Sequence, residues 1–327
     1  MQNSLPLDAW FAVNQSVNTS IKPLGNGHIH NTYLVGVDGE QYVLQNVNKI
    51  VFIDPDLVMS QTRRVLACFS QQTRYKVPVL VETSQGKVGI WRDGQYWRLW
   101  EYVPHSLVVD PIETLQQAAE AGSAFGALQK RLEKMPGEPL VDPIYGFLQL
   151  EHYLNEFEQV ATAAPVGLRK VVDAHRHLSQ QFSQRNCVIH GDCKVNNLLF
   201  NATGDRVLAV IDFDTAMFGH WAWDFGDLIR SVCFSRRRVE GSFFGACLKG
   251  FAQHQDRVNV RDSVAAPAYV ALMLGLRFLT DHLQGNIYFR AAKPGENLLR
   301  ARAQFELLEE FVVQAPQMQR VAGEVLG

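Results

Sequence analysis

The residues with the clearest capacity for chemistry lie in one stretch, Val188–Phe200, which reads VIHGDCKVNNLLF. This stretch sets Asp192, Lys194 and Asn197 in a short polar loop between two apolar runs, and a third apolar run ends at Asp212. Phosphoryl transfer requires an acceptor for the hydroxyl proton, a metal that bridges phosphate oxygens, and cations near the developing charge. We interpret Asp192 as the candidate base and Lys194 as a cation that can reach the γ-phosphate. Asn197 and Asp212 are candidate Mg²⁺ ligands, and two suffice because Mg²⁺ retains water and phosphate oxygens.

The spacing of these residues is more informative than any one of them. A turn-capping role would explain His190, Asp192 or Asn197 taken singly. The whole set, His-x-Asp-x-Lys-x-x-Asn with an Asp fifteen residues after the Asn, resembles the catalytic loop and metal-binding Asp of protein kinases. We therefore favour a catalytic role for the set over a purely structural one.

Two departures from the protein kinase pattern shift this resemblance. Gly191 follows the histidine where protein kinases usually have arginine, and the run Gly219–Asp224 follows the metal-binding Asp. Both features resemble the aminoglycoside phosphotransferase and choline kinase superfamily. The resemblance implies that Asp224 is buried and that its carboxylate holds the backbone of the catalytic loop. We interpret Asp227 and Arg230 as an ordinary i,i+3 helix pair.

The elements that must position this loop begin with short β-type runs separated by turn signals. Asp38-Gly39 between two of the runs predicts a tight hairpin, because glycine tolerates the positive φ of a type I′ turn. One helix, predicted from about Pro55 to Phe69 with Asp54-Pro55 as its start, interrupts the strands. The expected strands are Ile21–Leu24, Asn31–Val37, Gln41–Val47, Val77–Glu82, Lys87–Trp91 and Tyr96–Val103.

After Pro111 the pattern changes to long helices. We expect helices over 115–132, from about Leu148 to Thr162, from about Leu168 to Gln184, and again from near Gly226 to the end, with strands Val188–His190, Leu198–Phe200 and Val207–Ile211 around the polar loop. This order predicts an α+β, protein-kinase-like fold with two lobes. The β-rich N-terminal lobe, residues 1–103, would bind the nucleotide. The mainly helical C-terminal lobe, residues 104–327, would carry the catalytic and substrate-binding residues.

Composition narrows the function classes. The 327 residues are 47% hydrophobic and 20% charged, which is ordinary for a globular protein, and a formal net charge of −2 offers no basic field for nucleic acid. Nucleic acid and membrane are therefore not expected as partners. The apolar run Val264–Leu276 is too short for a span and is interpreted as a buried helix. Five cysteines without CxxC spacing favour a cytoplasmic protein. The oligomeric state stays open.

Three further segments sharpen the resemblance. They are Gly25–Tyr33, then Tyr42–Asn48 with Phe52-x-Asp54-Pro55, and Arg277–Asp281 with Gly285-x-x-Tyr288-Phe289. Together with the catalytic segment they look like N-acetylhexosamine 1-kinases over nearly the whole chain. The resemblance implies a kinase that uses ATP and Mg²⁺ to convert the anomeric hydroxyl of a sugar to its 1-phosphate.

The nucleotide side has an unusual feature. By analogy with a kinase glycine-rich loop, the backbone at Gly25 and Gly27 would cover the phosphates, and the strand end at Glu101 and Val103 would hydrogen-bond adenine through its backbone. The strand position that holds a phosphate-binding lysine in protein kinases is Gln45, which the resembling hexosamine kinases share. Gln45 can donate an amide hydrogen bond to phosphate but supplies no charge. The following helix likewise offers Gln61 in place of a glutamate, so the usual ion pair is missing.

On the acceptor side, the resemblance makes His28 a possible sugar-contacting residue beside the glycine turn. Arg277 and Asp281 lie four residues apart on one predicted helix face, where they either bind sugar hydroxyls or pair with each other. Several aromatic residues could stack on a sugar, although aromatic residues in such numbers are usually core. They are Trp221, Trp223, Phe234, Tyr288 and Phe289.

Two other hypotheses stay open. A kinase of an amino alcohol or an aminoglycoside would keep the same catalytic residues and change only the acceptor pocket. A kinase-like binding protein without catalysis is suggested by the missing lysine and glutamate, but it would be expected to have lost Asp192, Asn197 and Asp212. The chain has no Gly-x-x-x-x-Gly-Lys-Ser/Thr loop, so a P-loop nucleotidase has no support.

Overall fold

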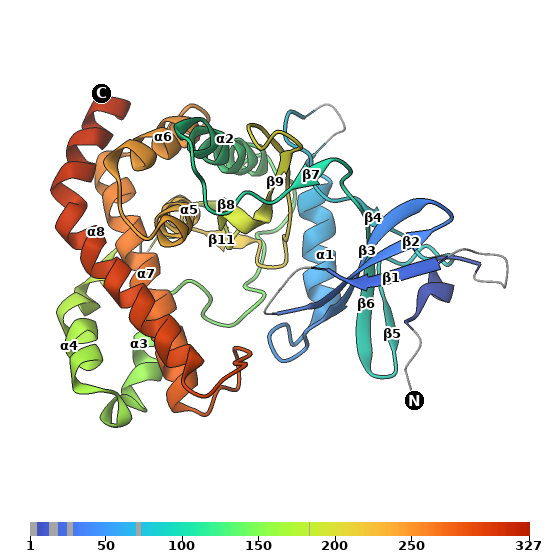
Figure 1. Cartoon of the computed structure of the whole chain (residues 1–327), viewed down its shortest axis with the longest axis horizontal. Helices are drawn as coiled ribbons and strands as arrows, with labels where there is room; N and C mark the ends of the chain where they lie inside the picture. Colours follow the sequence, from blue (N-terminus) through green and yellow to red (C-terminus); the bar gives the residue numbers. More distant parts are fainter. Residues whose placement is uncertain (1–4, 13–18, 25–28, 70–72, 183) are drawn as a thin grey trace.

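The computed structural model describes every residue except 1–4, 13–18, 25–28, 70–72 and 183. Two lobes lie side by side (Figure 1). The N-terminal lobe is a sheet with an α-helix, and the C-terminal lobe is mostly helical. The predicted α+β fold with two kinase-like lobes is confirmed. The boundary after Val103 stays a prediction, although strand β7 (Ser106–Leu107) already pairs with strand β9 (Leu198–Asn201) of the C-terminal lobe.

The N-terminal sheet has six strands among the described residues, in the order β1-β2-β3-β6-β4 with β5 also paired to β6. They are β1 (Thr19–Pro23), β2 (Asn31–Val37), β3 (Glu40–Val47), β4 (Leu80–Val81), β5 (Ile90–Arg92) and β6 (Gln95–Glu101). Asp38 and Gly39 both have positive φ, 50° and 92°, so the predicted hairpin turn is confirmed. Strands β4 and β5 are shorter than expected.

Helix α1 (Pro55–Leu66) packs beside this sheet (Figure 1). It starts as predicted, because the Asp54 carboxylate accepts a hydrogen bond of 2.9 Å from Leu57 N and proline occupies the first turn. The buried side chains of Val58 and Met59 pack with Phe52 and Tyr96 into a small core between helix and sheet. This core fixes α1 against the sheet, on the side of the C-terminal lobe (Figure 1).

The C-terminal lobe is built from long helices around one apolar core. They are α2 (Leu115–Leu132), α3 (Leu150–Glu158), α4 (Val166–His175), α5 (Trp221–Arg236), α6 (Gly241–Ala252), α7 (Val260–Leu283) and α8 (Glu296–Leu326). Two small β elements interrupt them: β9 pairs with β7 and β10 (Val207–Val210), and β8 (Cys187–Ile189) pairs with β11 (Met217–Gly219). These β elements hold the predicted polar loop.

Helix α7 contains the apolar run that was expected to be a buried helix. Its 24 residues exceed the predicted length and suffice by length and composition to cross a membrane. However, 72% of its most apolar window is buried inside the fold, where α7 packs against α5 and α8. The buried-helix prediction is confirmed, and the estimate of its length is wrong.

Other helix boundaries also differ from the predictions. The helix expected from about Leu148 to Thr162 is α3, which spans only Leu150–Glu158. The helix expected over 168–184 ends at His175, and a short 3₁₀ segment, Arg176–Gln180, follows it. The helix expected near Gly226 begins earlier, at Trp221, because the His220 side chain accepts a hydrogen bond from Ala222 N and caps the first turn. Histidine is not among the usual N-cap residues, so the start of this helix could not be predicted from its capping residue.

Candidate active site

The catalytic loop connects β8 to β9 and brings three predicted residues into contact. Lys194 Nζ lies 2.5 Å from Asp192 Oδ2. Asn197 Nδ2 donates to the same carboxylate oxygen at 2.9 Å and to the Asp192 carbonyl at 2.8 Å. The Asp192 side chain stays 25% exposed, so a substrate hydroxyl can reach it.

A second carboxylate holds the backbone of this loop. Asp224, in the first turn of α5, is 1% exposed and accepts hydrogen bonds from His190 N at 2.9 Å and Gly191 N at 2.8 Å. Gln129 Nε2 of helix α2 donates to it at 2.8 Å. The buried, loop-holding role implied for Asp224 is confirmed. The neighbouring Asp227 and Arg230 do form an i,i+3 pair, with Nε to Oδ1 at 2.8 Å.

Gly191 has a conformation that explains why no arginine stands there. Its φ is +82°, and a Cβ at this position would lie 2.5 Å from the Thr215 carbonyl oxygen. His190 beside it is fixed at both ring nitrogens: Nδ1 accepts from Asp192 N at 3.2 Å, so Nε2 carries the proton and donates to Ile211 O at 3.0 Å. The loop therefore presents Asp192 in one defined orientation.

The charges around Asp192 favour its ionised form. Burial acts to raise its pKa, but the Lys194 ammonium and the hydrogen bond from Asn197 outweigh burial and lower the pKa below 3.8. Burial likewise opposes the charge of Lys194, yet the Asp192 and Asp212 carboxylates raise the pKa of that ammonium above its usual value. Asp192 is thus a carboxylate and Lys194 a cation at neutral pH.

The candidate metal ligands meet at the end of β10. Ile211 N donates to the Asn197 carbonyl at 3.0 Å, which ties the residue before Asp212 to Asn197. Burial, with the nearby Asp214 and Asp192 carboxylates, raises the pKa of Asp212. The Asn197 amide nitrogen donates to Asp192, so the amide oxygen of Asn197 remains to coordinate a metal ion. A crowded carboxylate and an amide oxygen are hard oxygen donors and fit Mg²⁺.

Three residues at this site did not emerge from the sequence. Asp214 lies within 4.8 Å of Asp212 and accepts from both guanidinium nitrogens of Arg98, at 2.5 and 2.8 Å, and from His30 Nε2 at 2.8 Å. His30 Nδ1 accepts from Asn48 N, so both ring nitrogens are used and His30 is not a metal ligand. The available signal was an arginine in the middle of the aromatic strand β6, because a buried charge requires a partner.

On the nucleotide side, Gln45 faces Arg98 instead of standing free. Gln45 Oε1 accepts from Arg98 Nε at 2.9 Å and from Trp100 Nε1 at 2.8 Å, while Gln45 Nε2 lies 3.4 Å from Thr32 Oγ1. Gln61 of α1 exchanges two hydrogen bonds with the Val141 backbone. None of its described hydrogen bonds involves Gln45. A direct contact between Gln45 and phosphate stays a prediction.

The other predicted nucleotide contacts are Glu101 and Val103 at the exit of β6, and Gly25 and Gly27. Glu101 N donates to the Val79 carbonyl, and the Val103 carbonyl accepts from Ser106 Oγ at 2.6 Å. Both residues lie where the chain passes between the lobes, so their predicted role in holding adenine stays a prediction. Gly25 and Gly27, expected to cover the phosphates, lie outside the described residues.

On the acceptor side, Arg277 sits inside a box of four aromatic rings. Its guanidinium carbon lies 5.1 to 5.3 Å from the ring centroids of Phe147, Tyr153, Tyr288 and Phe289, and its Nη2 donates to Tyr288 Oη at 3.0 Å. Burial opposes its charge, but Tyr153, Tyr288 and the Asp192 carboxylate raise its pKa. Arg277 is therefore electrostatically coupled to the catalytic carboxylate.

Asp281 holds the wall of this box. Its buried carboxylate accepts from Tyr288 N at 2.6 Å, Phe289 N at 3.0 Å and Asn297 Nδ2 at 2.9 Å. Among the described contacts, Arg277 and Asp281 bind these other partners and not each other. A direct contact of either with an acceptor stays a prediction, and His28 lies outside the described residues. Trp221 and Trp223 are core residues, 1% and 3% exposed.

A cavity of about 410 Å³ adjoins the box, between the N-terminal sheet and the segment 286–290. Its lining is partly apolar and contains no acidic side chain among the described residues that form it, but it does carry amides and cations. These side chains are Asn31, Asn46, Asn48, Asn286, Lys49 and Arg290. The cavity therefore offers amide groups and positive charge, and no carboxylate among its described residues to attract a cation.

Comparison with known protein families matches residues 20–266 to the phosphotransferase enzyme family. The chain belongs to this family. It is thus a small-molecule phosphotransferase, and the core of the predicted function is confirmed at that level.

Solved structures share the fold of this phosphotransferase. A choline/ethanolamine kinase family protein from Mesorhizobium loti has a TM-score of 0.65 at 15% identity, covering 94% of this chain and 93% of that one. A microcompartment-associated aminopropanol kinase has a TM-score of 0.63 at 19% identity, covering 96% and 97%. A spectinomycin phosphotransferase in complex with ADP and spectinomycin has a TM-score of 0.62 at 11% identity, covering 95% and 97%.

Proposed function

We propose that this phosphotransferase transfers the γ-phosphate of ATP, with Mg²⁺, to a hydroxyl of a neutral sugar, the anomeric hydroxyl of an N-acetylhexosamine being the leading candidate. The observation that carries the proposal is the aromatic box filled by Arg277. Faces of four aromatic rings are what a quaternary or protonated amine would bind. Here the chain's own guanidinium already occupies them.

The same charge disfavours the cationic alternatives. A second unit charge about 6 Å from Arg277 would be repelled by about 3 kcal/mol at an effective dielectric of 20. The amide-rich cavity beside the box adds Lys49 and Arg290 and no described carboxylate, so it offers no compensation to an amino alcohol or an aminoglycoside. Amide groups and a guanidinium do suit the hydroxyl and acetamido oxygens of a sugar.

The loop supports an in-line transfer. The acceptor oxygen forms a bond to the γ-phosphorus while the bond from that phosphorus to the bridging oxygen of ADP breaks, and the hydroxyl proton passes to Asp192 and then to solvent. Because Asp192 is ionised at neutral pH, it chiefly orients the hydroxyl and takes the proton late. Lys194 stabilises charge on the transferred phosphate. Asn197 and Asp212 would hold Mg²⁺, which would supply positive charge that neutralises the phosphates.

A substrate panel with an ADP-release assay tests the acceptor. We expect turnover of an N-acetylhexosamine and none of choline, ethanolamine, aminopropanol or spectinomycin. Turnover of an amino alcohol or an aminoglycoside without any sugar would overturn the proposal. Absence of turnover with retained Mg²⁺-dependent ATP binding would favour a binding protein.

The variant Arg277→Ala tests the box directly. It leaves four rings without their cation, so we expect it to gain affinity for choline while it loses the sugar, because the vacated rings form a cation site. Arg290→Ala serves as the control, since it removes a cation from the cavity beside the box and leaves Arg277 among the four rings. If Arg277→Ala retains sugar turnover and gains no choline binding, Arg277 is not the selective element.

A further inference from the structure

The nucleotide site lacks a cation at Gln45 but has one directly across the sheet. Gln45 on β3 and Arg98 on β6 are paired in the antiparallel register. Directly paired residues point to the same face of a sheet, with Cβ atoms about 5 Å apart. The charge that is missing from β3 is therefore present one strand further along.

Arg98 is held as a buried charge whose direction is fixed. Its side chain is 1% exposed, its Nε donates to Gln45 at 2.9 Å, and Nη1 and Nη2 donate to the two oxygens of Asp214. Nη1 also faces Met59 Sδ at 3.4 Å. One Nη2 hydrogen has no acceptor in the described part of the chain. Burying a guanidinium costs free energy unless all of its hydrogens are paired, so the contacts of Arg98 differ from those of an ordinary surface ion pair.

The guanidinium also lies next to the metal and phosphate end of the site. Its partner Asp214 has a carboxylate oxygen within 4.8 Å of Asp212, the candidate Mg²⁺ ligand. The pair joins strand β6 of the N-terminal lobe to the loop after β10 of the C-terminal lobe. Asp214 thus places the Arg98 guanidinium one ion pair away from the candidate Mg²⁺ ligand.

We propose that Arg98 is the phosphate-binding cation of this enzyme, and that Gln45 acts as a positioning residue that orients Arg98. This inference rests on the proposed use of a nucleoside triphosphate and is independent of the acceptor. The remaining Nη2 hydrogen and the positive charge serve the nucleotide phosphates, while Asp214 keeps the guanidinium in place. The cation therefore lies on β6, at the residue paired in register with Gln45, and not on β3.

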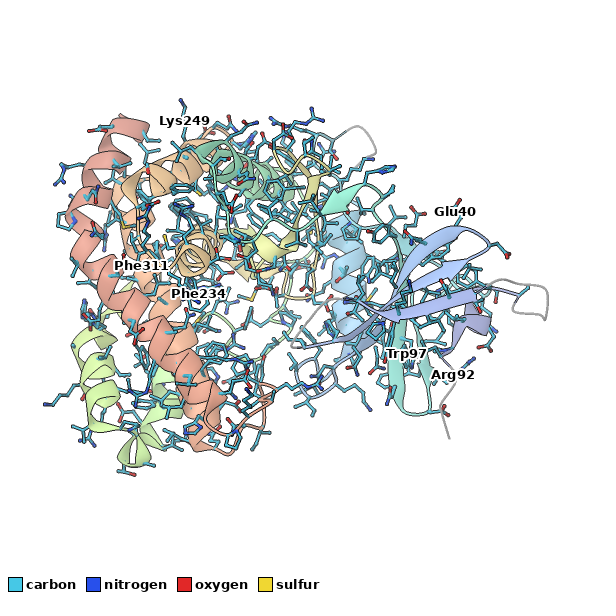
Figure 2. All side chains as sticks on the ribbon, viewed as in Figure 1. Glu40, Arg92, Trp97, Phe234, Lys249 and Phe311 are labelled. Atoms are coloured by element: carbon cyan, nitrogen blue, oxygen red, sulfur yellow. The ribbon has the colours of Figure 1, made fainter. Side chains whose placement is uncertain are left out.

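Nucleotide affinity measured by titration calorimetry tests the assignment without turnover. Arg98→Gln should weaken Mg²⁺-ATP and Mg²⁺-ADP binding about 10- to 100-fold, the worth of one charge-assisted contact, and leave adenosine binding unchanged. The double variant Gln45→Lys/Arg98→Gln returns the cation to β3 and should recover most of the lost affinity. Arg92→Gln is the matched control, because Arg92 lies on the N-terminal lobe away from the C-terminal lobe and pairs with Asp8 (Figure 2).

The double variants control for loss of folding, because they do not leave the Asp214 carboxylate buried without a cation. Arg98→Gln leaves Asp214 without its guanidinium, whereas Arg98→Gln/Asp214→Asn removes both charges and Gln45→Lys/Arg98→Gln keeps one cation opposite Asp214. Equal ATP affinity in a folded variant without Arg98, an equal loss for adenosine, or no recovery in the Gln45→Lys variant would each overturn the role of Arg98. Failure of the unaltered protein to bind ATP would instead refute the proposed nucleotide, and the Arg98 assignment would fall with it.

Discussion

Replacing Asp224 with asparagine should uncouple the catalytic loop from the C-terminal core. Asp224 Oδ2 accepts from both His190 N and Gln129 Nε2, while Oδ1 accepts from Gly191 N. The asparagine oxygen will therefore occupy the first position, and its amide will face Gly191 N–H. One charge-assisted hydrogen bond is lost and one buried donor is left unpaired, which together cost about 3 kcal/mol. The orphaned donor immediately precedes Asp192.

Thermal denaturation and steady-state kinetics measure the two consequences. At about 2 °C per kcal/mol for a lobe of this size, Tm should fall by about 6 °C. A displaced Asp192 should lower kcat by about 10- to 100-fold, because small misplacements of reacting groups are costly. Asp256→Asn is the control for the same chemical change, since the Asp256 side chain is 100% exposed and contacts only Lys130 at 3.4 Å among its described partners. If Asp224→Asn retains both Tm and kcat, the carboxylate does not hold the loop.

Three further predictions follow from the same geometry. Gly191→Ala forces a side chain into positive φ and towards Thr215, so it should lose at least about 1–2 kcal/mol in chemical denaturation, and an unchanged midpoint would refute the strain. Asp281→Asn weakens the turn at Tyr288 and should raise the KM for the sugar more than it changes the Kd for ATP; equal effects on both would contradict a local role. Because the Lys194 ammonium holds the pKa of Asp192 below its usual value, Asp192 stays ionised in the mildly acidic range, so its titration should produce no fall in kcat above about pH 5 at saturating Mg²⁺. A fall near neutral pH that Asp192→Asn abolishes would contradict the lowered pKa.

The catalytic loop could be predicted from the sequence because its contacts are local. Asp192, Lys194 and Asn197 fall within six residues, and a rigid pair of strands sets their mutual positions. The hairpin at Asp38 and the start of α1 follow equally from local backbone preferences. The family resemblance supplied the one distant contact that was predicted, from Asp224 to the loop.

The rest depended on contacts between distant segments. Arg98 and Asp214 are 116 residues apart, and nothing local connects them. The hydrogen-bond partners of Gln45 on β6 lie far from it along the chain, so the sequence did not indicate that Gln45 binds Arg98. The spacing of Arg277 and Asp281 suggested that they might pair, but each binds partners contributed by the loop that follows their helix. Sequence spacing identifies residues on one face of a helix but not what packs against that face.

In the proposed reaction, Asp192 directs transfer of the γ-phosphate of ATP to a sugar hydroxyl. ³¹P NMR of the protein with ATP, Mg²⁺ and an N-acetylhexosamine tests it most directly, with Asp192→Asn as the comparison. We predict a sugar 1-phosphate signal coupled to the anomeric proton, formed about 100-fold more slowly by a folded variant that still binds ATP. No sugar phosphate from the unaltered protein, or equal rates from both proteins, would contradict the account.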